Sequence, residues 1–239
     1  MIYTVKRFAY VKRQYATAKF ASHFAPIQLE IGTPGGAEAA IHAVRRYAEN
    51  LAKDYIIVKL DFKNAFNTLR RDTMLEAIRR KLPELYNFAH ATYHGAPVLQ
   101  FGEFIILSAE GPQQGDSLSS AEFCLAIHPL LRGLISELKV GYLDDATLSG
   151  PRQIVVDDIK TIISKSQELG LELNAAKCEV TYGDSSTVHD DPILKTFSAL
   201  KWMTSHCWKH RSFQDEPWIK LSKKKTEKLE KAMTRLHLL

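Results

Sequence analysis

Two spacings of apolar residues run through the chain, and together they predict a mixture of helices and strands. Segments with apolar residues every three or four positions predict helices, which fall at residues 37–53, 73–82, 85–93, 121–135 and 151–169. Shorter runs rich in β-branched and aromatic residues predict strands, which fall at residues 55–60, 97–101, 104–107, 139–141, 146–149 and 178–182. Asp72 is expected to cap the helix that follows it, and Gly170 to close the last helix.

The strand runs at 139–141 and 146–149 flank two adjacent acids, Asp144 and Asp145. This pattern predicts a tight hairpin with both carboxylates at its tip. Neighbouring carboxylates repel each other, and a divalent cation such as Mg²⁺, which prefers oxygen ligands, would offset the repulsion. Taken alone, the pair also fits a plain solvated turn.

Asp61 directly follows the strand predicted at 55–60. A buried strand that ends in an acid can deliver that carboxylate to the edge of a sheet, here beside Asp144 and Asp145. Three acids from two strands could hold two Mg²⁺ ions about 3.5–4 Å apart, the arrangement that polymerases use for phosphoryl transfer. Asp61 by itself also fits a strand-end turn or a helix N-cap.

A polar loop at residues 111–120 leads into the helix predicted at 121–135. Asp116 or Ser117 is expected to cap that helix. Gly115 has no side chain, so its backbone could come close to a base or a sugar. An ordinary loop before a helix would explain the same residues.

In this order the segments resemble the palm of reverse transcriptases, and they are most similar to those of non-LTR (LINE-like) retrotransposons. The family has an acid followed five residues later by an aromatic, a Gln-Gly loop, a Tyr-x-Asp-Asp hairpin and a later segment with a lysine. In this chain these are Asp61 with Phe66, Gln114-Gly115-Asp116, Tyr142 to Asp145, and Gly170 to Cys178. Ile31 to Ala40 is similar to the segment that joins fingers to palm, and the resemblance covers roughly residues 11 to 182.

The resemblance implies an α+β fold, in which a small antiparallel sheet packs on helices, with partial fingers and a basic helical C-terminal tail. Residues 1–182 would form the reverse transcriptase domain, with fingers at 1–50 and palm at 51–182. Residues 183–239 would be a linker and basic tail, a possible thumb remnant. Fingers and thumb are shorter than in the family, so the chain is expected to be truncated.

The resemblance also implies an RNA-directed DNA polymerase, which transfers a nucleotide from a dNTP to a primer 3′-hydroxyl on an RNA template. Asp61 and Asp144 would bind two Mg²⁺ ions, for which Mn²⁺ could substitute. The Phe62 carbonyl would be a further ligand, and Asp145 a more peripheral acid. Lys177 would donate a proton or charge to pyrophosphate, or else be a surface lysine.

Four residues are expected to contact substrates. Phe66 would stack under the sugar and exclude a 2′-hydroxyl, unless it is a core aromatic. Gln114 and Gly115 would lie along the template base and the incoming nucleotide, and Tyr142 would touch the primer end. Two alternatives stay open: a viral RNA-dependent RNA polymerase, against which Phe66 speaks, and a non-catalytic nucleic-acid-binding remnant.

Composition agrees with a nucleic-acid partner without identifying one. The net charge is +5 and the pI about 9.0, which suits a phosphate backbone. Three dispersed cysteines without CxxC spacing argue against disulfides and zinc and favour a reducing compartment. The start lacks a signal-peptide core, and no apolar run reaches about 18 residues. We therefore expect an intracellular protein, cytoplasmic or nuclear, with no transmembrane segment; the oligomeric state is left open.

Overall fold

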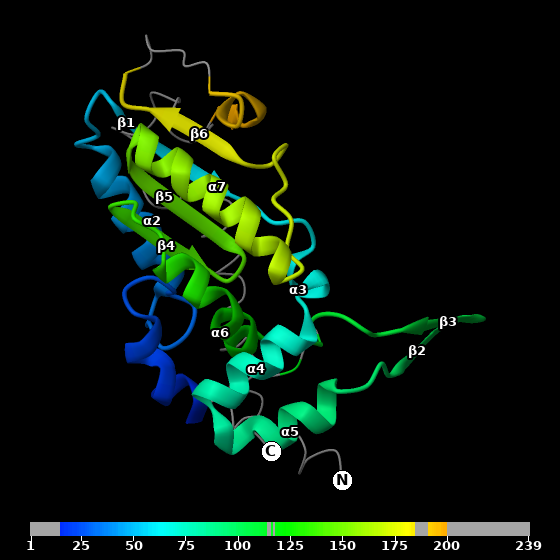
Figure 1. Cartoon of the computed structure of the whole chain (residues 1–239). Helices are drawn as coiled ribbons and strands as arrows, with labels where there is room; N and C mark the ends of the chain where they lie inside the picture. Colours follow the sequence, from blue (N-terminus) through cyan, green and yellow to red (C-terminus); the bar gives the residue numbers. More distant parts are fainter. Residues whose placement is uncertain (1–14, 114–115, 117, 185–190, 200–239) are drawn as a thin grey trace, which may run out of the picture. The chain divides into compact units, whose positions relative to one another are not determined.

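A computed structural model describes residues 15–113, 116, 118–184 and 191–199, and its elements confirm the predicted α+β fold (Figure 1). The expected basic helical tail lies outside the described residues. Residues 15–24 are helical. The other elements are α2 (Gly36–Ala48), β1 (Tyr55–Leu60), α3 (Ala65–Thr68), α4 (Arg71–Lys81), α5 (Pro83–Tyr93), β2 (Val98–Phe101), β3 (Phe104–Leu107), α6 (Ser119–Arg132), β4 (Leu138–Tyr142), β5 (Asp145–Pro151), α7 (Arg152–Glu168), β6 (Glu179–Tyr182), the 3-10 helix η1 (Leu194–Thr196) and β7 (Ser198–Ala199).

Five strands form one sheet in the order β4-β5-β1-β6-β7, which puts β1 at the centre. β1 runs antiparallel to β5 and β6, and β4 runs antiparallel to β5. β7 pairs with β6 in parallel, so the sheet continues beyond Tyr182. The strands predicted from the apolar runs are confirmed within one or two residues.

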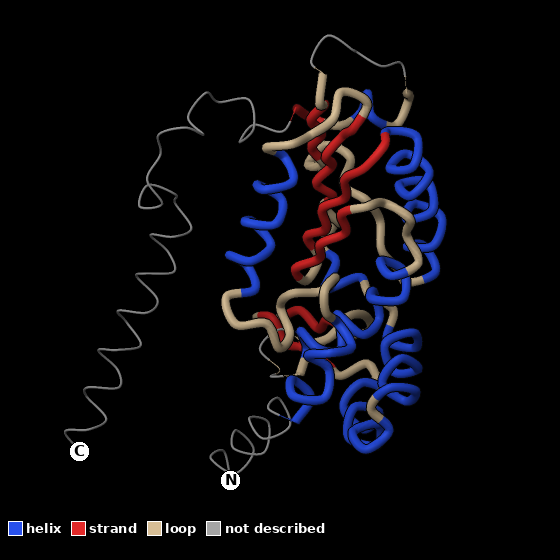
Figure 2. Tube along the Cα trace, turned by 90° about the vertical axis from the view of Figure 1, so that its left-hand side faces the viewer, coloured by secondary structure: helices blue, strands red, loops and turns tan. Residues whose placement is uncertain are grey.

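One face of the sheet carries the hydrophobic core. Ile56, Val58 and Leu60 alternate along β1 and belong to the buried cluster, together with Val155 and Ile159 of α7. Helix α7 packs against β1 and β5. Figure 2 shows α7 on this side of the sheet, whereas α2 stands on the opposite side.

The opposite face carries Tyr55, Ile57 and Lys59, because successive side chains of a strand point to opposite faces. Helix α2 packs against β4 on this face. The end of the face beyond Lys59 remains accessible: the side chains of Lys59 and Asp145 are 39% and 55% exposed. We call this end, with Lys59, Asp61 and Asp145, the acidic end of the sheet.

Strands β2 and β3 form a separate two-stranded sheet, which projects away from the rest of the described chain (Figure 1). The exposed fractions of Phe104, Ile105, Ile106 and Leu107 lie between 51% and 73%. This hairpin was predicted from the sequence, but its exposure was not. None of the described helices has both the length and the apolar character needed to cross a membrane.

Several helix ends differ from the prediction, among them that of α6, which ends at Arg132 rather than at residue 135. Helix α2 ends at Ala48 rather than at residue 53, because the chain turns before it enters β1. Helix α4 has Arg70 at its N-cap position, not the expected Asp72. Asp72 lies in the first turn, where Oδ1 accepts a hydrogen bond from Arg70 Nε (3.0 Å).

Candidate active site

The hairpin that carries the two adjacent acids forms as predicted. Tyr142 pairs with Asp145, which leaves Leu143 and Asp144 as a two-residue turn. Leu143 has φ 57°, a left-handed conformation that costs a residue with a Cβ roughly 1–2 kcal/mol. Its side chain packs against the hydrophobic core, which offsets that cost. The turn therefore holds Asp144 at the tip, with Asp145 as the first residue of β5.

The central strand brings Asp61 to the same end of the sheet. Leu60 of β1 pairs with Ala146 of β5. Asp61 directly follows Leu60 at the end of β1, and Asp145 directly precedes Ala146 at the start of β5. The two acids therefore lie side by side at the same end of the sheet. Sequence reasoning predicted this convergence, since an antiparallel pair places the end of one strand beside the start of the next.

Hydrogen bonds hold the main chain of Asp61, whereas one of its carboxyl oxygens has no partner in the described chain. Cys178 Sγ accepts a hydrogen bond from the Asp61 N–H (3.5 Å), and the Asn174 N–H donates to the Asp61 carbonyl (2.9 Å). Asp61 Oδ1 is buried and, among the described residues, has no hydrogen-bond partner. A buried oxygen without a partner is costly, and a bound cation is one group that would satisfy it.

The three carboxylates interact electrostatically. Burial raises the pKa of Asp144 above its ordinary value, and the charges of Asp145 and Asp61 raise it further. Lys59 opposes this rise, and its Nζ lies 3.5 Å from Asp145 Oδ1. A raised pKa means that the protein disfavours the ionised carboxylate, so a cation at this position would relieve the repulsion.

The oxygen atoms at this end of the sheet suit a hard cation whose coordination the substrate would complete. Oxygen atoms of Asp61 and Asp144 suit Mg²⁺, which commonly uses one or two carboxylates together with substrate phosphates. Within residues 15–184 and 191–199, as far as the structure describes them, no three His, Cys, Asp or Glu side chains gather closely enough to hold an ion alone. Water molecules, joined by phosphate oxygens once a substrate is bound, would supply the remaining ligands.

The segment before the turn is tightly packed. The Gly141 N–H donates to the Ile27 carbonyl (2.7 Å), and a Cβ at Gly141 would come within 3.0 Å of Gln28 Cδ. Burial and a hydrogen bond to Glu30 raise the pKa of Tyr142 to about 12. Tyr142 is therefore a neutral phenol at physiological pH, fixed beside the acids.

Phe66 is held by ring stacking. Its ring lies parallel to that of Phe123 in α6, with centroids 4.6 Å apart and an angle of 9°. Gly111 lies against the same segment with φ 68°, and a Cβ there would be 2.0 Å from the Phe66 carbonyl oxygen. Only glycine fits this contact. The loop before α6 is thereby seated on the turn that follows Asp61.

Arg71, which the sequence analysis missed, anchors the same loop. It is buried, with 7% exposed. Its guanidinium donates to the carbonyls of Gly111 (2.9 Å) and Gly95 (3.0 Å), to Ser108 Oγ (2.8 Å) and to the Ser108 carbonyl. It also lies 5.4 Å from the centroid of the Tyr93 ring. An arginine beside Arg70 and Asp72 looks like a surface residue, so no sequence signal identified it.

The start of α6 is held by a buried tyrosine. The Tyr93 hydroxyl donates to Asp116 Oδ2 (2.8 Å), and Asp116 Oδ1 accepts from the Leu118 N–H (3.1 Å). The N-cap position falls on Leu118 rather than on the expected Asp116 or Ser117, and Ser117 lies outside the described residues. Asp116 acts instead on the turn that precedes the helix.

Glu122 is a second residue that sequence reasoning missed. It is 3% exposed, and neither carboxyl oxygen accepts a hydrogen bond of good geometry in the described chain, although the nearby Tyr93 hydroxyl partly lowers its pKa. Burial, and then the charge of Asp116, raise the pKa of Glu122 to about 8. The available signal was its place as the one acid in the apolar stretch 121–135.

Two predicted contacts, Gln114 and Gly115, lie outside the described residues. Lys177 is exposed, and its N–H donates to the Asn174 carbonyl (2.8 Å) in the turn that also holds Asp61. The structure thus gathers Asp61, Asp144 and Asp145 and places Lys177 beside the residues that hold Asp61.

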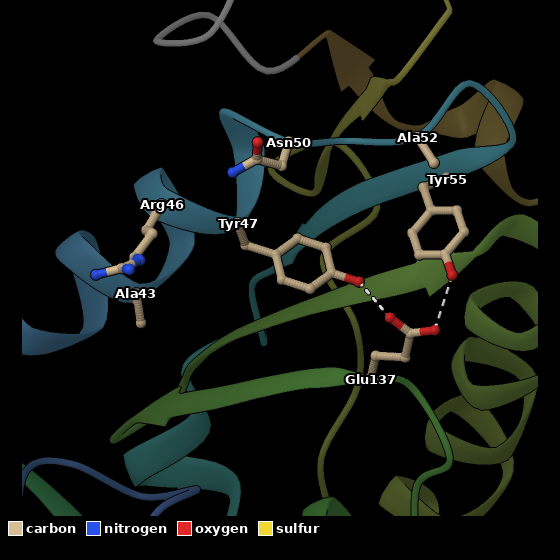
Figure 3. Close-up of a pocket in the computed structure, with 7 residues that line it drawn as sticks. All are labelled: Ala43, Arg46, Tyr47, Asn50, Ala52, Tyr55 and Glu137. Carbon is tan, nitrogen blue, oxygen red and sulfur yellow. Dashed lines mark hydrogen bonds between the residues drawn. The ribbon is translucent and has the colours of Figure 1, made fainter.

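A separate cavity of about 540 Å³ lies between α2 and the sheet (Figure 3). Glu137 accepts hydrogen bonds there from the hydroxyls of Tyr47 (2.7 Å) and Tyr55 (2.8 Å). Tyr55 begins β1 and Asp61 follows its end, so this cavity is distinct from the acidic end. The other lining residues are Ala43, Arg46, Asn50 and Ala52.

Comparison with known proteins identifies the family. The sequence matches the family described as "Reverse transcriptase (RNA-dependent DNA polymerase)" over residues 5–231. A search of curated proteins finds no match. Among solved structures, the fold is similar to apo telomerase from Candida tropicalis (TM-score 0.57, 12% identity, 75% of this chain and 37% of that chain). It is also similar to the same telomerase in complex with the TWJ fragment of telomeric RNA (TM-score 0.56, 14% identity, 73% and 34%).

These likenesses concern the fold, and the chain spans 37% and 34% of the two telomerase chains. The family match covers nearly the whole sequence, and it agrees with the palm expected from the order of the motifs. This chain therefore belongs to the reverse transcriptase family of RNA-dependent DNA polymerases.

Proposed function

We propose that this chain is the polymerase core of a non-LTR (LINE-like) retrotransposable element, which copies an RNA template into DNA. The observation that carries the proposal is the convergence of Asp61 with Asp144 and Asp145 at one accessible end of the sheet. The family match supports RNA-directed DNA synthesis. The telomerase structure solved with telomeric RNA supports an RNA partner. The residues that make up the motifs support the non-LTR type.

Asp61, Asp144 and the Phe62 carbonyl would hold two Mg²⁺ or Mn²⁺ ions, which would lower the pKa of the primer 3′-hydroxyl and neutralise triphosphate charge. The unpartnered Oδ1 of Asp61 and the raised pKa of Asp144 support this assignment, because the first is a buried oxygen without a hydrogen-bond partner in the described chain and the second is a carboxylate whose ionised form is disfavoured by burial and by its acidic neighbours. Asp145 has Lys59 beside it and serves as the peripheral acid.

The reaction forms one bond and breaks one. The primer 3′-hydroxyl gives its proton to a water molecule, and its oxygen bonds to the α-phosphorus of the dNTP while the bond from that phosphorus to pyrophosphate breaks. Lys177, exposed beside the turn that holds Asp61, donates a proton to the departing pyrophosphate. Tyr142, a neutral phenol, contacts the primer end. Gln114 and Gly115 line the template base and the incoming nucleotide.

Phe66 selects deoxynucleotides in this proposal. Stacking on Phe123 holds its ring in one orientation, which suits a barrier against a 2′-hydroxyl. Phe66→Ala is expected to raise the use of ribonucleotides relative to deoxynucleotides by about tenfold or more. A steric misfit of one small group costs about 1–3 kcal/mol, and each 1.4 kcal/mol or so is a factor of ten in rate. Unchanged selectivity would count against this role.

The test is primer extension by the 239-residue chain on an RNA template with a DNA primer, dNTPs and Mg²⁺. Asp144→Asn is expected to lower the rate by about a thousandfold or more, the scale of several kcal/mol of charge stabilisation. Asp157→Asn is the matched control, because Asp157 lies exposed on α7 and pairs with Lys160 (3.2 Å). Extension that survives Asp144→Asn would refute the proposed site. Template binding without any extension by the wild type would favour the non-catalytic alternative.

A further inference from the structure

Lys59 is the one charged residue of β1, and it lies on the accessible face of the sheet. It precedes Asp61 by two positions, so the two side chains share a face. The register places Lys59 opposite Thr147 of β5 and Glu179 of β6. Lys59 is the next-to-last residue of β1, and its side chain, 39% exposed, reaches the open end of that face, where the acids lie.

The partner is one specific acid of the three. Lys59 Nζ lies 3.5 Å from Asp145 Oδ1. Asp61 Oδ1, in contrast, has no partner within the described part of the chain. Asp144 lies in the turn directly before Asp145, and the charges of both Asp145 and Asp61 raise its pKa. The acidic end is therefore asymmetric: Asp145 has a fixed countercharge, whereas an oxygen of Asp61 is left free.

We propose that Lys59 is a positioning residue that holds Asp145 aside and thereby reserves Asp61 and Asp144 for the divalent cations. This inference rests on the proposed function. Lys59 has two effects on a cation at the acidic end. Its charge repels the cation, and its ion pair withholds a carboxylate that would otherwise be a ligand. Removal of Lys59 therefore tightens cation binding, whereas damage to the fold would weaken it.

The experiment measures Mn²⁺ binding to the 239-residue chain without nucleic acid, from the electron paramagnetic resonance signal of free Mn²⁺. Lys59→Met is expected to lower the Kd about threefold to tenfold, the size of the repulsion between a unit charge and a divalent ion roughly 8 Å apart in a medium as polar as water. Lys59→Arg keeps the charge and is expected to stay within about twofold of wild type. The double variant Lys59→Met/Asp145→Asn is expected to lose most of the gain.

Lys160→Met is the control, because Lys160 forms a similarly exposed pair with Asp157 on α7 and is expected to leave the Kd unchanged. Circular dichroism checks that each variant is folded, and Lys59→Gln replaces Lys59→Met should the latter fail. A Kd that is unchanged or weaker in the folded Lys59 variants would overturn the positioning role. Wild-type binding that Asp144→Asn does not reduce would instead refute the metal site, and with it the proposed function.

Discussion

The β4–β5 and β2–β3 hairpins have matching turns in contrasting surroundings. Each has a two-residue turn, Leu143-Asp144 in one and Gly102-Glu103 in the other. The first residue of each turn is left-handed, with φ 57° at Leu143 and 59° at Gly102. A Cβ at Gly102 would touch nothing within 4 Å, whereas the Leu143 side chain packs against the core.

The difference shows that backbone geometry alone does not make a site. Glycine takes the left-handed position where no packing is available, and leucine takes it where burial offsets the strain. The β4–β5 turn is supported by a five-stranded sheet and can hold interacting carboxylates in place. The β2–β3 hairpin has no such sheet, and an isolated two-stranded hairpin is marginally stable in water. Its support must come from the segments that join it to the rest of the chain, which Arg71 binds at Gly95, Ser108 and Gly111.

Arg71→Ala should release the segments that join this hairpin to the rest of the chain, with a large effect on stability. The substitution leaves the carbonyls of Gly95, Ser108 and Gly111 without a donor, and the expected loss is about 3–4 kcal/mol of unfolding free energy. Urea denaturation measures the loss, and limited proteolysis should then cut within residues 95–108. Arg70→Ala, which removes only an exposed pair with Asp72, should cost less than about 1 kcal/mol. Equal losses in the two variants would contradict the anchor.

Glu122→Gln, in the helix α6 that follows the hairpin, should remove a pH dependence of the unfolding free energy. The folded-state pKa of about 8 exceeds the ordinary value of 4.5, so the protonated form stabilises the protein and that stability is lost as pH rises towards 8. Between pH 5 and pH 8 the wild type should therefore lose about 2–4 kcal/mol relative to the variant. Urea midpoints of both proteins at the two pH values measure this difference. Parallel pH profiles would show that Glu122 is not the group responsible.

Asp144→Asn should stabilise the β4–β5 turn, the opposite of its expected effect on the proposed polymerase activity. Burial and two acidic neighbours raise the pKa of Asp144, so its stabilising form is the protonated one, and that stability is lost as pH rises through the folded pKa. At pH 7 the variant should gain at most about 1 kcal/mol, since the side chain is only half-buried and solvent screens its charge. Thermal unfolding without divalent cations measures the gain. A lower melting temperature would mean that the ionised carboxylate has a partner.

Ile105→Ala should have the smallest effect. Ile105 is 73% exposed, so its truncation should change the unfolding free energy by less than about 0.5 kcal/mol. Leu148→Ala is the counterpart in β5, where the side chain is 1% exposed, and it should cost about 2–5 kcal/mol. Denaturation of both variants tests the contrast directly. A large loss from Ile105→Ala would indicate that the β2–β3 hairpin is covered in solution.

Local sequence patterns predicted those parts of the structure that depend mainly on neighbouring residues, such as strands and turns. The apolar run 55–60 and the paired acids Asp144 and Asp145 were sufficient to predict β1 and the acidic hairpin. Two of the residues that were missed, Arg71 and Lys59, depend on partners far along the chain, and the third, Glu122, is buried by the packing of α6. Arg71 bonds to carbonyls at 95, 108 and 111, and Lys59 meets Asp145 through strand pairing. Their residue types suggest solvent exposure, and only the tertiary fold assigns them other surroundings.

The central position of β1 has a consequence for synthesis of the protein on the ribosome. Ile56 pairs on one side with Gly150 and on the other with Tyr182, so β1 leaves the exit tunnel long before either partner strand exists. Such distant pairings fold slowly, and an apolar strand that waits for them is open to aggregation. Nascent chains that end before β6 would keep one edge of β1 unpaired, a state in which chaperone binding would be most useful.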